Sequence, residues 1–287
     1  MSSNNVSHIR SKNFYFFWRS RFLDKSTRDD AFKVYSFIQV LTSFVDSGTK
    51  QDIAAFVHIE KRWKTIKKEL IKNKVPPALD DSPEEQALAN IAYVVHRLSC
   101  DTAWVDAMLH SKRWDLERHE YASLKDTDTY TYGTFEVVAL FMARILRLPE
   151  EALTSARMQG RAIGYIHYLY DLQADAAKGR CYFSSNEYKK YGLKNLSIEE
   201  ATAKPKMFAD FVHAQLLRYA KAQAVANKGY VYIPKKVRAP LQGVIDTYNG
   251  MAQKLKENPL TIYDKNFRPK RRSVVRHTIV RSLKRTT

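Results

Sequence analysis

The sequence predicts an all-α protein with a single helical domain. In three long segments, 84–98, 150–174 and 207–226, apolar residues recur every three or four positions, which is the period of an amphipathic helix, and none shows the alternation of a strand. With 45% hydrophobic residues and only nine Gly and nine Pro among 287, the composition is that of a compact globular protein. Because no repeat, low-complexity segment or clear linker divides the chain, we expect one helical domain over 1–264, followed by a basic tail over 265–287.

The first helices follow from capping residues and turns. Ser26, with Asp29 three residues later, resembles a capping box, so we expect it to open the first helix. Pro-containing turns at 75–77 and 80–83 separate the next two helices. The helices expected in the first half of the chain are 27–45, 50–72, 83–98, 102–112 and 117–128.

The second half is organised around the Leu148-Pro149 break, because Pro interrupts a helix. Long helices are expected on either side of it, and residues 184–196 are expected to form a loop. The helices expected here are 132–146, 150–177, 207–226 and 240–257.

The positive charge is concentrated at the C-terminus. The net charge is +18, from 48 Lys and Arg against 30 Asp and Glu, and 265–287 holds nine of the basic residues and no acid. Val275, Ile279 and Leu283 repeat every four residues there, which predicts a basic amphipathic helix. Such a helix can dock on the protein core, bind an anionic membrane surface or bind nucleic acid, and charge alone does not choose among the three. No nucleic-acid-binding motif accompanies it, so we expect no nucleic acid partner.

Other features predict a cytoplasmic protein, with attachment to a membrane surface as an open alternative. The first residues lack the apolar core of a signal peptide, and no apolar run reaches the roughly 18 residues that span a bilayer. The most apolar segment, 137–148, contains Arg144 and Arg147 and is expected to be a core helix. Cys100 and Cys181 are too few for a disulfide framework or a zinc cluster, which fits a reducing compartment.

The segment from His167 to Arg180 carries the strongest chemical signal. A helix places His167, Asp171 and Asp175 on one face, where the two carboxylates can converge on a divalent cation and a diphosphate. In Lys178-Gly179-Arg180, the glycine is a natural helix stop and the flanking cations suit a helix C-terminus or a phosphate. A solvated acidic face with a basic cap is the alternative interpretation.

The order of features along nearly the whole chain resembles the squalene/phytoene synthase family of head-to-head prenyltransferases. The resemblance implies an isoprenoid-synthase-type helical bundle with a central apolar cavity and diphosphates bound at the mouth of that cavity. The matching runs are 11–15, 21–23, 31–46, 114–116, 130–134 and 160–183, followed by Tyr248 and the basic segment around Arg268.

The resemblance also implies roles for individual residues. The family ionises allylic diphosphates with Mg²⁺ held by carboxylates, and Asp171 and Asp175 match its second aspartate motif. Arg180 matches a diphosphate contact. Ser11 and Lys12 match a phosphate-binding turn near the N-terminus, and Tyr130 and Tyr248 match tyrosines near the reacting groups.

The first aspartate motif departs from the family pattern. Of its carboxylates only Asp46 remains, because Thr42 and Ser43 stand where acids are expected and Gln39 stands where an arginine is usual. Asp46 is therefore a further candidate metal ligand. His167 replaces a usual asparagine, and it can bind the metal through a ring nitrogen or hydrogen-bond Asp171. Gly164, Tyr170 and Ala174 are further departures.

The resemblance predicts a Mg²⁺-dependent enzyme that condenses two isoprenyl diphosphates, farnesyl or geranylgeranyl, through a cyclopropyl intermediate to a phytoene- or squalene-like product. A weakened first motif leaves open an enzyme with one metal cluster that only ionises or transfers a single prenyl chain. A non-catalytic protein that keeps the fold to bind a lipid or a protein partner is the alternative from another class.

Overall fold

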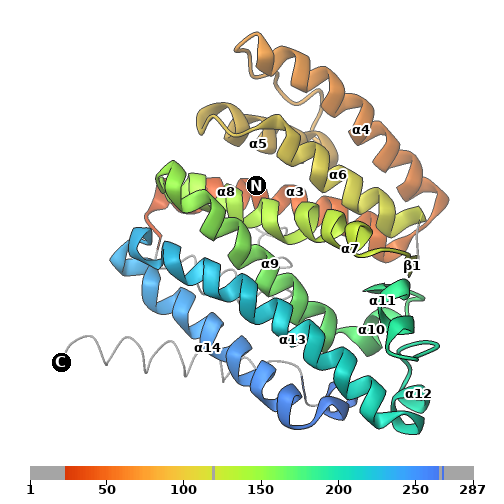
Figure 1. The fold of residues 1–287 in the computed structure, drawn as a ribbon. Helices are drawn as coiled ribbons and strands as arrows, with labels where there is room; N and C mark the ends of the chain where they lie inside the picture. The colour runs from red at the N-terminus through yellow and green to blue at the C-terminus, as the bar shows by residue number, and fades with distance from the viewer. Residues whose placement is uncertain (1–22, 118–119, 265–266, 268–287) are drawn as a thin grey trace.

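The computed structural model describes residues 23–117, 120–264 and 267 of the chain, and they form a bundle of α-helices (Figure 1). The all-α prediction is confirmed. The long helices are α3 (Lys25–Ser47), α4 (Lys50–Ile71), α5 (Pro83–Arg97), α6 (Thr102–Glu117), α8 (Val137–Ile145), α9 (Leu153–Tyr170), α13 (Pro205–Lys228) and α14 (Lys235–Glu257). Shorter elements are β1 (Glu120–Tyr121), α7 (Leu124–Thr131), η1 (Tyr132–Glu136), η2 (Glu150–Ala152), α10 (Leu172–Ala176), β2 (Cys181–Ser184), α11 (Ser185–Lys190), α12 (Ile198–Ala203), η3 (Gly229–Tyr232) and η4 (Pro259–Tyr263).

Helix α9 lies between the two halves of the bundle (Figure 1). On one side it packs against α8 and η1, and on the other it packs along α13 and contacts α14. One apolar core joins α3, α4, α5, α6 and α8, and a second, rich in tyrosine, joins α7, α9, β2, α13 and α14. The C-terminal end of α9 therefore meets segments from both halves.

Three local predictions are wrong. The cap of α3 is Asp24, whose side chain accepts a hydrogen bond from the Thr27 amide, so the helix begins before Ser26. The segment 117–128 is not one helix, because β1 interrupts it and pairs in parallel with β2. The segment 184–196 is not entirely loop, since Ser184 caps α11 by accepting from the Glu187 amide.

Helix η1 is a π-helix between α7 and α8, and it is held by close packing at two glycines. A Cβ atom at Gly133 would lie 2.1 Å from the Ala107 carbonyl oxygen, and one at Gly160 would lie 2.4 Å from the Phe135 carbonyl oxygen. The buried Glu136 at the end of η1 is paired with Arg161, whose Nε lies 2.5 Å from Oε1. Any side chain at either glycine would push α6 or α9 away from η1.

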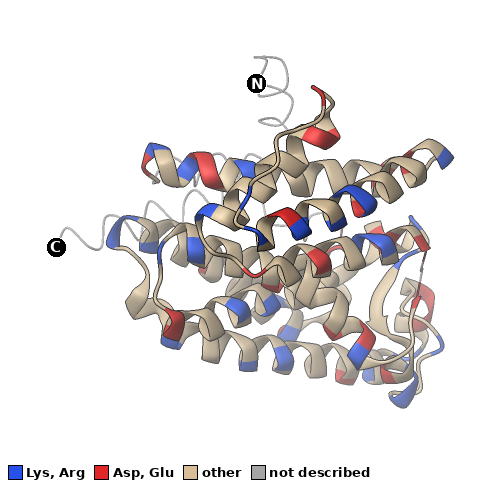
Figure 2. Ribbon diagram, turned by 90° about the horizontal axis from the view of Figure 1, so that it is seen from above, with Lys and Arg blue, Asp and Glu red and all other residues tan. Residues whose placement is uncertain are grey.

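No helix among the described residues has both the length and the apolar character needed to cross a bilayer. Figure 2 shows Lys and Arg on helices across the bundle, interleaved with Asp and Glu. The boundary at residue 264 and the amphipathic tail with Val275, Ile279 and Leu283 stay predictions, because those three residues and nearly all of 265–287 lie outside the described part of the chain.

Candidate active site

The two carboxylates predicted to bind metal lie at the junction of α9 and α10. Asp171 ends α9 with φ −95° and ψ 0°, yet its amide still donates to the His167 carbonyl (2.9 Å), and the Asp175 amide donates to the Asp171 carbonyl (2.8 Å). The helical hydrogen-bond pattern therefore continues across the junction. Asp171 and Asp175 stay one turn apart on one face, as their spacing predicts.

Gly179 ends this helix, as predicted from the sequence. Its φ of +71° lies in the left-handed region that favours glycine, and its amide donates to the Ala176 carbonyl (2.9 Å). The reversed chain brings the Arg180 amide to the Asp175 carbonyl, at 2.9 Å. The turn at Gly179 thus holds the Arg180 backbone against the last turn of α10, which carries Asp175.

Asp175 is difficult to ionise in this setting. Burial is the largest cause that raises its pKa, to about 7, and the negative charge of Asp171 is the second, while Lys178 and Arg180 act in the opposite direction. A cation bound between the two carboxylates removes their mutual repulsion and stabilises both charged forms. A cation between the two carboxylates would therefore be favoured electrostatically.

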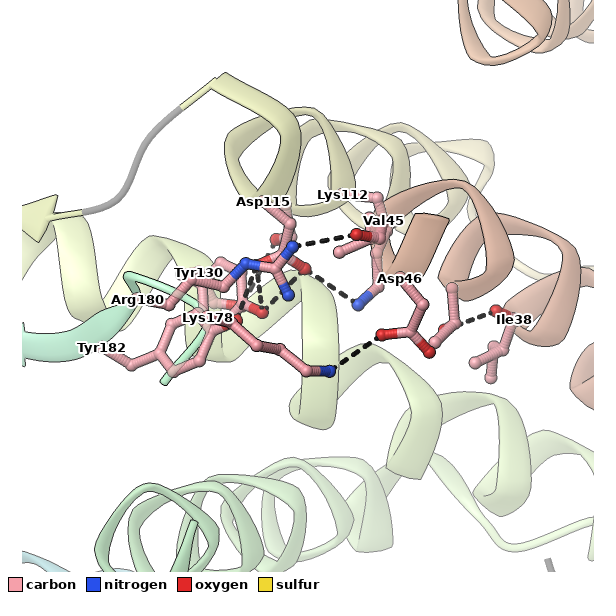
Figure 3. A network of polar contacts seen from close by, with 11 residues as sticks. Ile38, Val45, Asp46, Lys112, Asp115, Tyr130, Lys178, Arg180 and Tyr182 are labelled. Atoms are coloured by element: carbon pink, nitrogen blue, oxygen red, sulfur yellow. Dashed lines mark hydrogen bonds and ion pairs between the residues drawn. The ribbon is translucent and has the colours of Figure 1, made fainter. Parts of the chain in front are cut away.

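The segment after Asp175 is fastened to the C-terminal end of α3 (Figure 3). Lys178 Nζ lies 3.0 Å from Asp46 Oδ1, and the Arg180 guanidinium donates to the Val45 carbonyl at 2.9 Å. The Arg180 Nε atom is buried and has no hydrogen-bond partner among the described residues. An anion beside Arg180 would supply the missing acceptor.

Asp115 is the centre of a buried polar cluster that the sequence analysis did not single out (Figure 3). Its carboxylate accepts hydrogen bonds from the hydroxyls of Tyr130 (2.8 Å) and Tyr182 (2.9 Å) and pairs with Lys112 Nζ (3.0 Å). The buried position of Asp115 could have been predicted from the sequence. It lies on the same face of α6, at helical spacing, as three residues that are also buried, Trp104, Met108 and Ser111. Buried carboxylates in folded proteins are paired.

The tyrosines around Asp115 form a stack that stays protonated. The Tyr130 and Tyr182 rings stack with centroids 4.6 Å apart, and Tyr168 stacks on Tyr182 at 5.3 Å. Burial first, and the charge of Asp115 second, raise the pKa of Tyr130 and of Tyr182 well above that of a free tyrosine. The hydroxyls therefore act as hydrogen-bond donors rather than as bases.

His167 joins the site to α14. Its Nε2 atom lies 2.9 Å from the Tyr248 hydroxyl, and the Tyr170 hydroxyl lies 2.6 Å from Nδ1. Tyr248 thus lies beside His167 on α9, and its role near the reacting groups stays a prediction. Both ring nitrogens of His167 have tyrosine partners here, and its role as a metal ligand stays a prediction.

The remnant of the first motif offers one carboxylate. The Thr42 hydroxyl donates to the Ile38 carbonyl and the Ser43 hydroxyl donates to the Val40 carbonyl, both at 2.8 Å. Within the residues that the structure describes, no three His, Cys, Asp or Glu side chains gather closely enough to hold a metal ion. Ser11 and Lys12 lie outside the described residues, and their role stays a prediction, as does the central cavity.

Comparison with known proteins decides the family. The model of the squalene/phytoene synthase family matches residues 9–278. The chain belongs to the squalene/phytoene synthase family. It is therefore a member of a family of prenyltransferases that join isoprenoids head to head, as the sequence resemblance predicts.

Individual relatives of this squalene/phytoene synthase family member are distant. A presqualene diphosphate synthase from Rhodopseudomonas palustris is 26% identical over 232 residues, which cover 78% of this chain and 77% of that protein. A 15-cis-phytoene synthase from a Paracoccus species is 22% identical over 179 residues, or 62% of this chain and 57% of that protein.

Solved structures of the family share the fold. A dehydrosqualene synthase crystallised with a ligand superimposes with a TM-score of 0.76 at 16% identity, over 98% of this chain and 94% of that one. A squalene synthase from Alicyclobacillus acidocaldarius gives a TM-score of 0.70 at 15% identity, over 86% and 90%. The isoprenoid-synthase-type fold is confirmed.

The residues of this squalene/phytoene synthase family member fit Mg²⁺ at one of the two aspartate motifs. Mg²⁺ favours oxygen ligands, keeps several waters and is commonly bound by one or two carboxylates together with substrate phosphates. Asp171 and Asp175 supply two carboxylates whose repulsion a cation relieves, so the second motif fits. The first motif fits less well, since Asp46 is paired with Lys178.

Proposed function

We propose that this chain binds isoprenyl diphosphates at the C-terminal end of α9 with Mg²⁺, and condenses two of them head to head. The observation that carries the proposal is the Asp171–Asp175 pair, in which the pKa of Asp175 is raised to about 7, beside the cations Lys178 and Arg180. A carboxylate pair that favours a cation, next to donors that favour an anion, matches the two parts of a magnesium diphosphate.

Each residue of the site has a task in this proposal. Asp171 and Asp175 hold the metal. Arg180 donates its buried, unpartnered Nε to a diphosphate oxygen, and its guanidinium stays oriented by the Val45 carbonyl. Lys178, which is about half exposed, adds positive charge at the same mouth. When bound, Mg²⁺ supplies further positive charge to the departing diphosphate.

The tyrosines contribute hydrogen bonds and ring faces. Tyr130 is fixed by Asp115, and Tyr248 is fixed by His167, so each ring has a defined orientation. Allylic ionisation leaves a carbocation, and aromatic faces stabilise cations. We assign Tyr130 and Tyr248 to that environment.

The test is turnover by the purified full chain. Farnesyl or geranylgeranyl diphosphate is incubated with and without Mg²⁺, and diphosphate release and the extracted hydrocarbon are measured. We expect release and a product of two joined prenyl chains only with Mg²⁺, and loss of both in Asp171→Asn and Asp175→Asn. Asp210→Asn, an exposed carboxylate on α13, is the matched control and should retain full activity.

Two other outcomes contradict parts of the proposal. Diphosphate release with no joined product indicates an enzyme that only ionises one chain, which the single carboxylate of the first motif would then explain. Tight binding of the prenyl diphosphate with no release indicates a non-catalytic binding protein.

A further inference from the structure

The turn η3 exposes two neighbouring apolar side chains at its tip. Val231 is 68% exposed and Tyr232 is 41% exposed, although both belong to the short connection between α13 and α14. We call residues 229–232 the η3 tip. Single exposed apolar residues are ordinary, but two adjacent ones on a fixed turn call for a physical explanation.

The η3 tip is held rigidly from behind. A Cβ atom at Gly229 would lie 2.4 Å from Ser155 Cβ, so the turn sits directly on α9. Arg238 donates to the carbonyls of Ile233 (2.6 Å) and Val231 (2.8 Å), and its guanidinium lies 5.9 Å from the Tyr230 ring centroid. The backbone is thus fixed while the Val231 and Tyr232 side chains remain in solvent.

Lysines flank the η3 tip on both sides. Lys228 precedes it, and Lys235 and Lys236 follow it, and all three are exposed. Between Asp210 and Asp246 the sequence has six Lys and Arg and no acid. Lys236 lies 3.2 Å from Asp24, whereas Lys228 has no carboxylate partner among the described residues. Helix η2, which packs against η3, adds the exposed carboxylates of Glu150 and Glu151, and Glu150 is paired with Arg144. The cations around the tip still outnumber these carboxylates.

We propose that the η3 tip inserts into the surface of an anionic lipid bilayer. An aliphatic side chain suits the acyl boundary, a tyrosine suits the headgroup level, and lysines beside them suit anionic headgroups. Lys228, Lys235 and Lys236 supply the charge complementarity.

The position of the tip fits this attachment. The tip contacts the N-terminal end of α9 at Ser155, and Asp171 lies 16 residues later, or about 24 Å along a helix. A bilayer at the tip would therefore leave the carboxylate pair clear of the headgroups. This inference does not depend on the proposed catalytic function.

The test places a reporter at the tip of the full chain. Tyr232→Trp is mixed with vesicles of phosphatidylglycerol and phosphatidylcholine that carry brominated acyl chains, and quenching of tryptophan fluorescence beyond that of the unmodified chain is measured. Leu217→Trp is the matched control, because Leu217 is 56% exposed on α13 away from the tip. We expect strong additional quenching at position 232 and none at position 217.

A second comparison measures binding itself. Val231→Asp combined with Tyr232→Asp should weaken sedimentation with anionic vesicles at least fivefold, Leu217→Asp should leave it unchanged, and pure phosphatidylcholine vesicles should bind little. Unchanged thermal unfolding of each variant shows that it is folded. Three results would overturn the proposal: no vesicle binding, equal binding to both lipid compositions, or binding without quenching at position 232, which would locate the contact elsewhere, as in the predicted tail.

Discussion

The Nζ atom of Lys178 lies 3.0 Å from Oδ1 of Asp46, so the last carboxylate of the first motif is paired with a cation from the segment that follows Asp175. Both side chains are more than half exposed, and such a pair contributes little to stability. Its importance lies in position, because it joins the end of α3 to the segment that follows α10. A metal ion at Asp46 has to compete with Lys178.

A second carboxylate one turn before Asp46 should change that competition. Thr42 and Ser43 lie four and three residues earlier in α3, so both are helical neighbours of Asp46. We expect Thr42→Asp to raise the affinity for Mn²⁺ several-fold, measured by calorimetry on the protein with metal alone. Ala220→Asp, at an exposed position of α13 with no acid within one turn, is the control for added charge and should change the affinity less than twofold; equal gains in the two variants would refute a site at Asp46.

Removal of the Asp115 carboxylate should strongly destabilise the fold. Asp115→Ala leaves the Lys112 ammonium and the hydroxyls of Tyr130 and Tyr182 without their shared acceptor, and breaking a buried ion pair costs about 3–5 kcal/mol. Tyr182→Phe removes one hydrogen bond and should cost only about 1 kcal/mol. Urea unfolding measures both, and a cost for Asp115→Ala no larger than that for Tyr182→Phe would show that the cluster is not coupled.

Ionisation of the Asp175 carboxyl group should make the metal-free protein less stable as pH rises. The pKa of Asp175 is near 7 in the folded state and lies near 4 in an unfolded chain, so the folded state holds more protons between these values and its stability falls as pH increases through that window. Because the carboxyl is partly exposed and coupled to Asp171, we expect Asp175→Asn to stabilise the metal-free protein at pH 8 by roughly 1–2 kcal/mol, and by much less at pH 4.

Bound Mg²⁺ should offset the destabilisation caused by the ionised Asp175. Mg²⁺ with inorganic diphosphate should raise the thermal unfolding temperature of the unmodified protein and leave that of Asp175→Asn unchanged. An equal shift in both proteins would indicate that the ligand binds elsewhere.

Gly160 should not tolerate a side chain. A Cβ atom there would meet backbone atoms of η1, the Phe135 carbonyl oxygen at 2.4 Å and the Glu136 Cα at 2.7 Å, and backbone gives way less easily than a side chain. We expect Gly160→Ala to destabilise the protein by about 2–3 kcal/mol. Gly250→Ala on α14 is the control, since nothing lies within 4 Å of its Cβ position, and it should stabilise by up to about 1 kcal/mol.

The sequence predicted what local chemistry determines. The helices α5, α9 and α13 lie in the three segments whose apolar residues recur with a helical period, and Gly179 ends α10 because glycine takes a positive φ at little cost. The one-turn spacing of Asp171 and Asp175 survives the junction after α9 for the same reason, since the hydrogen bonds across it are local.

Features that depend on distant contacts were not predicted. The pairing of β1 with β2 joins Glu120 to Cys181. The two strands have two and four residues, which is too short for an alternation of polar and apolar residues to identify them as strands or as partners. No role for Asp115 could be predicted from the sequence, because its tyrosine partners come from α7 and β2. Asp24 and Ser26 are both good caps two residues apart, so local preference did not rank them.

A crystal structure of the full chain with Mn²⁺ and a thiodiphosphate analogue of farnesyl diphosphate, which resists ionisation, would show directly whether Asp171 and Asp175 hold the metal. We expect an anomalous peak within coordination distance of carboxylate oxygens of both Asp171 and Asp175, with diphosphate oxygens completing the coordination and Arg180 Nε donating to one of them. A diphosphate bound without metal contact to either aspartate would show that these two residues are not the metal ligands.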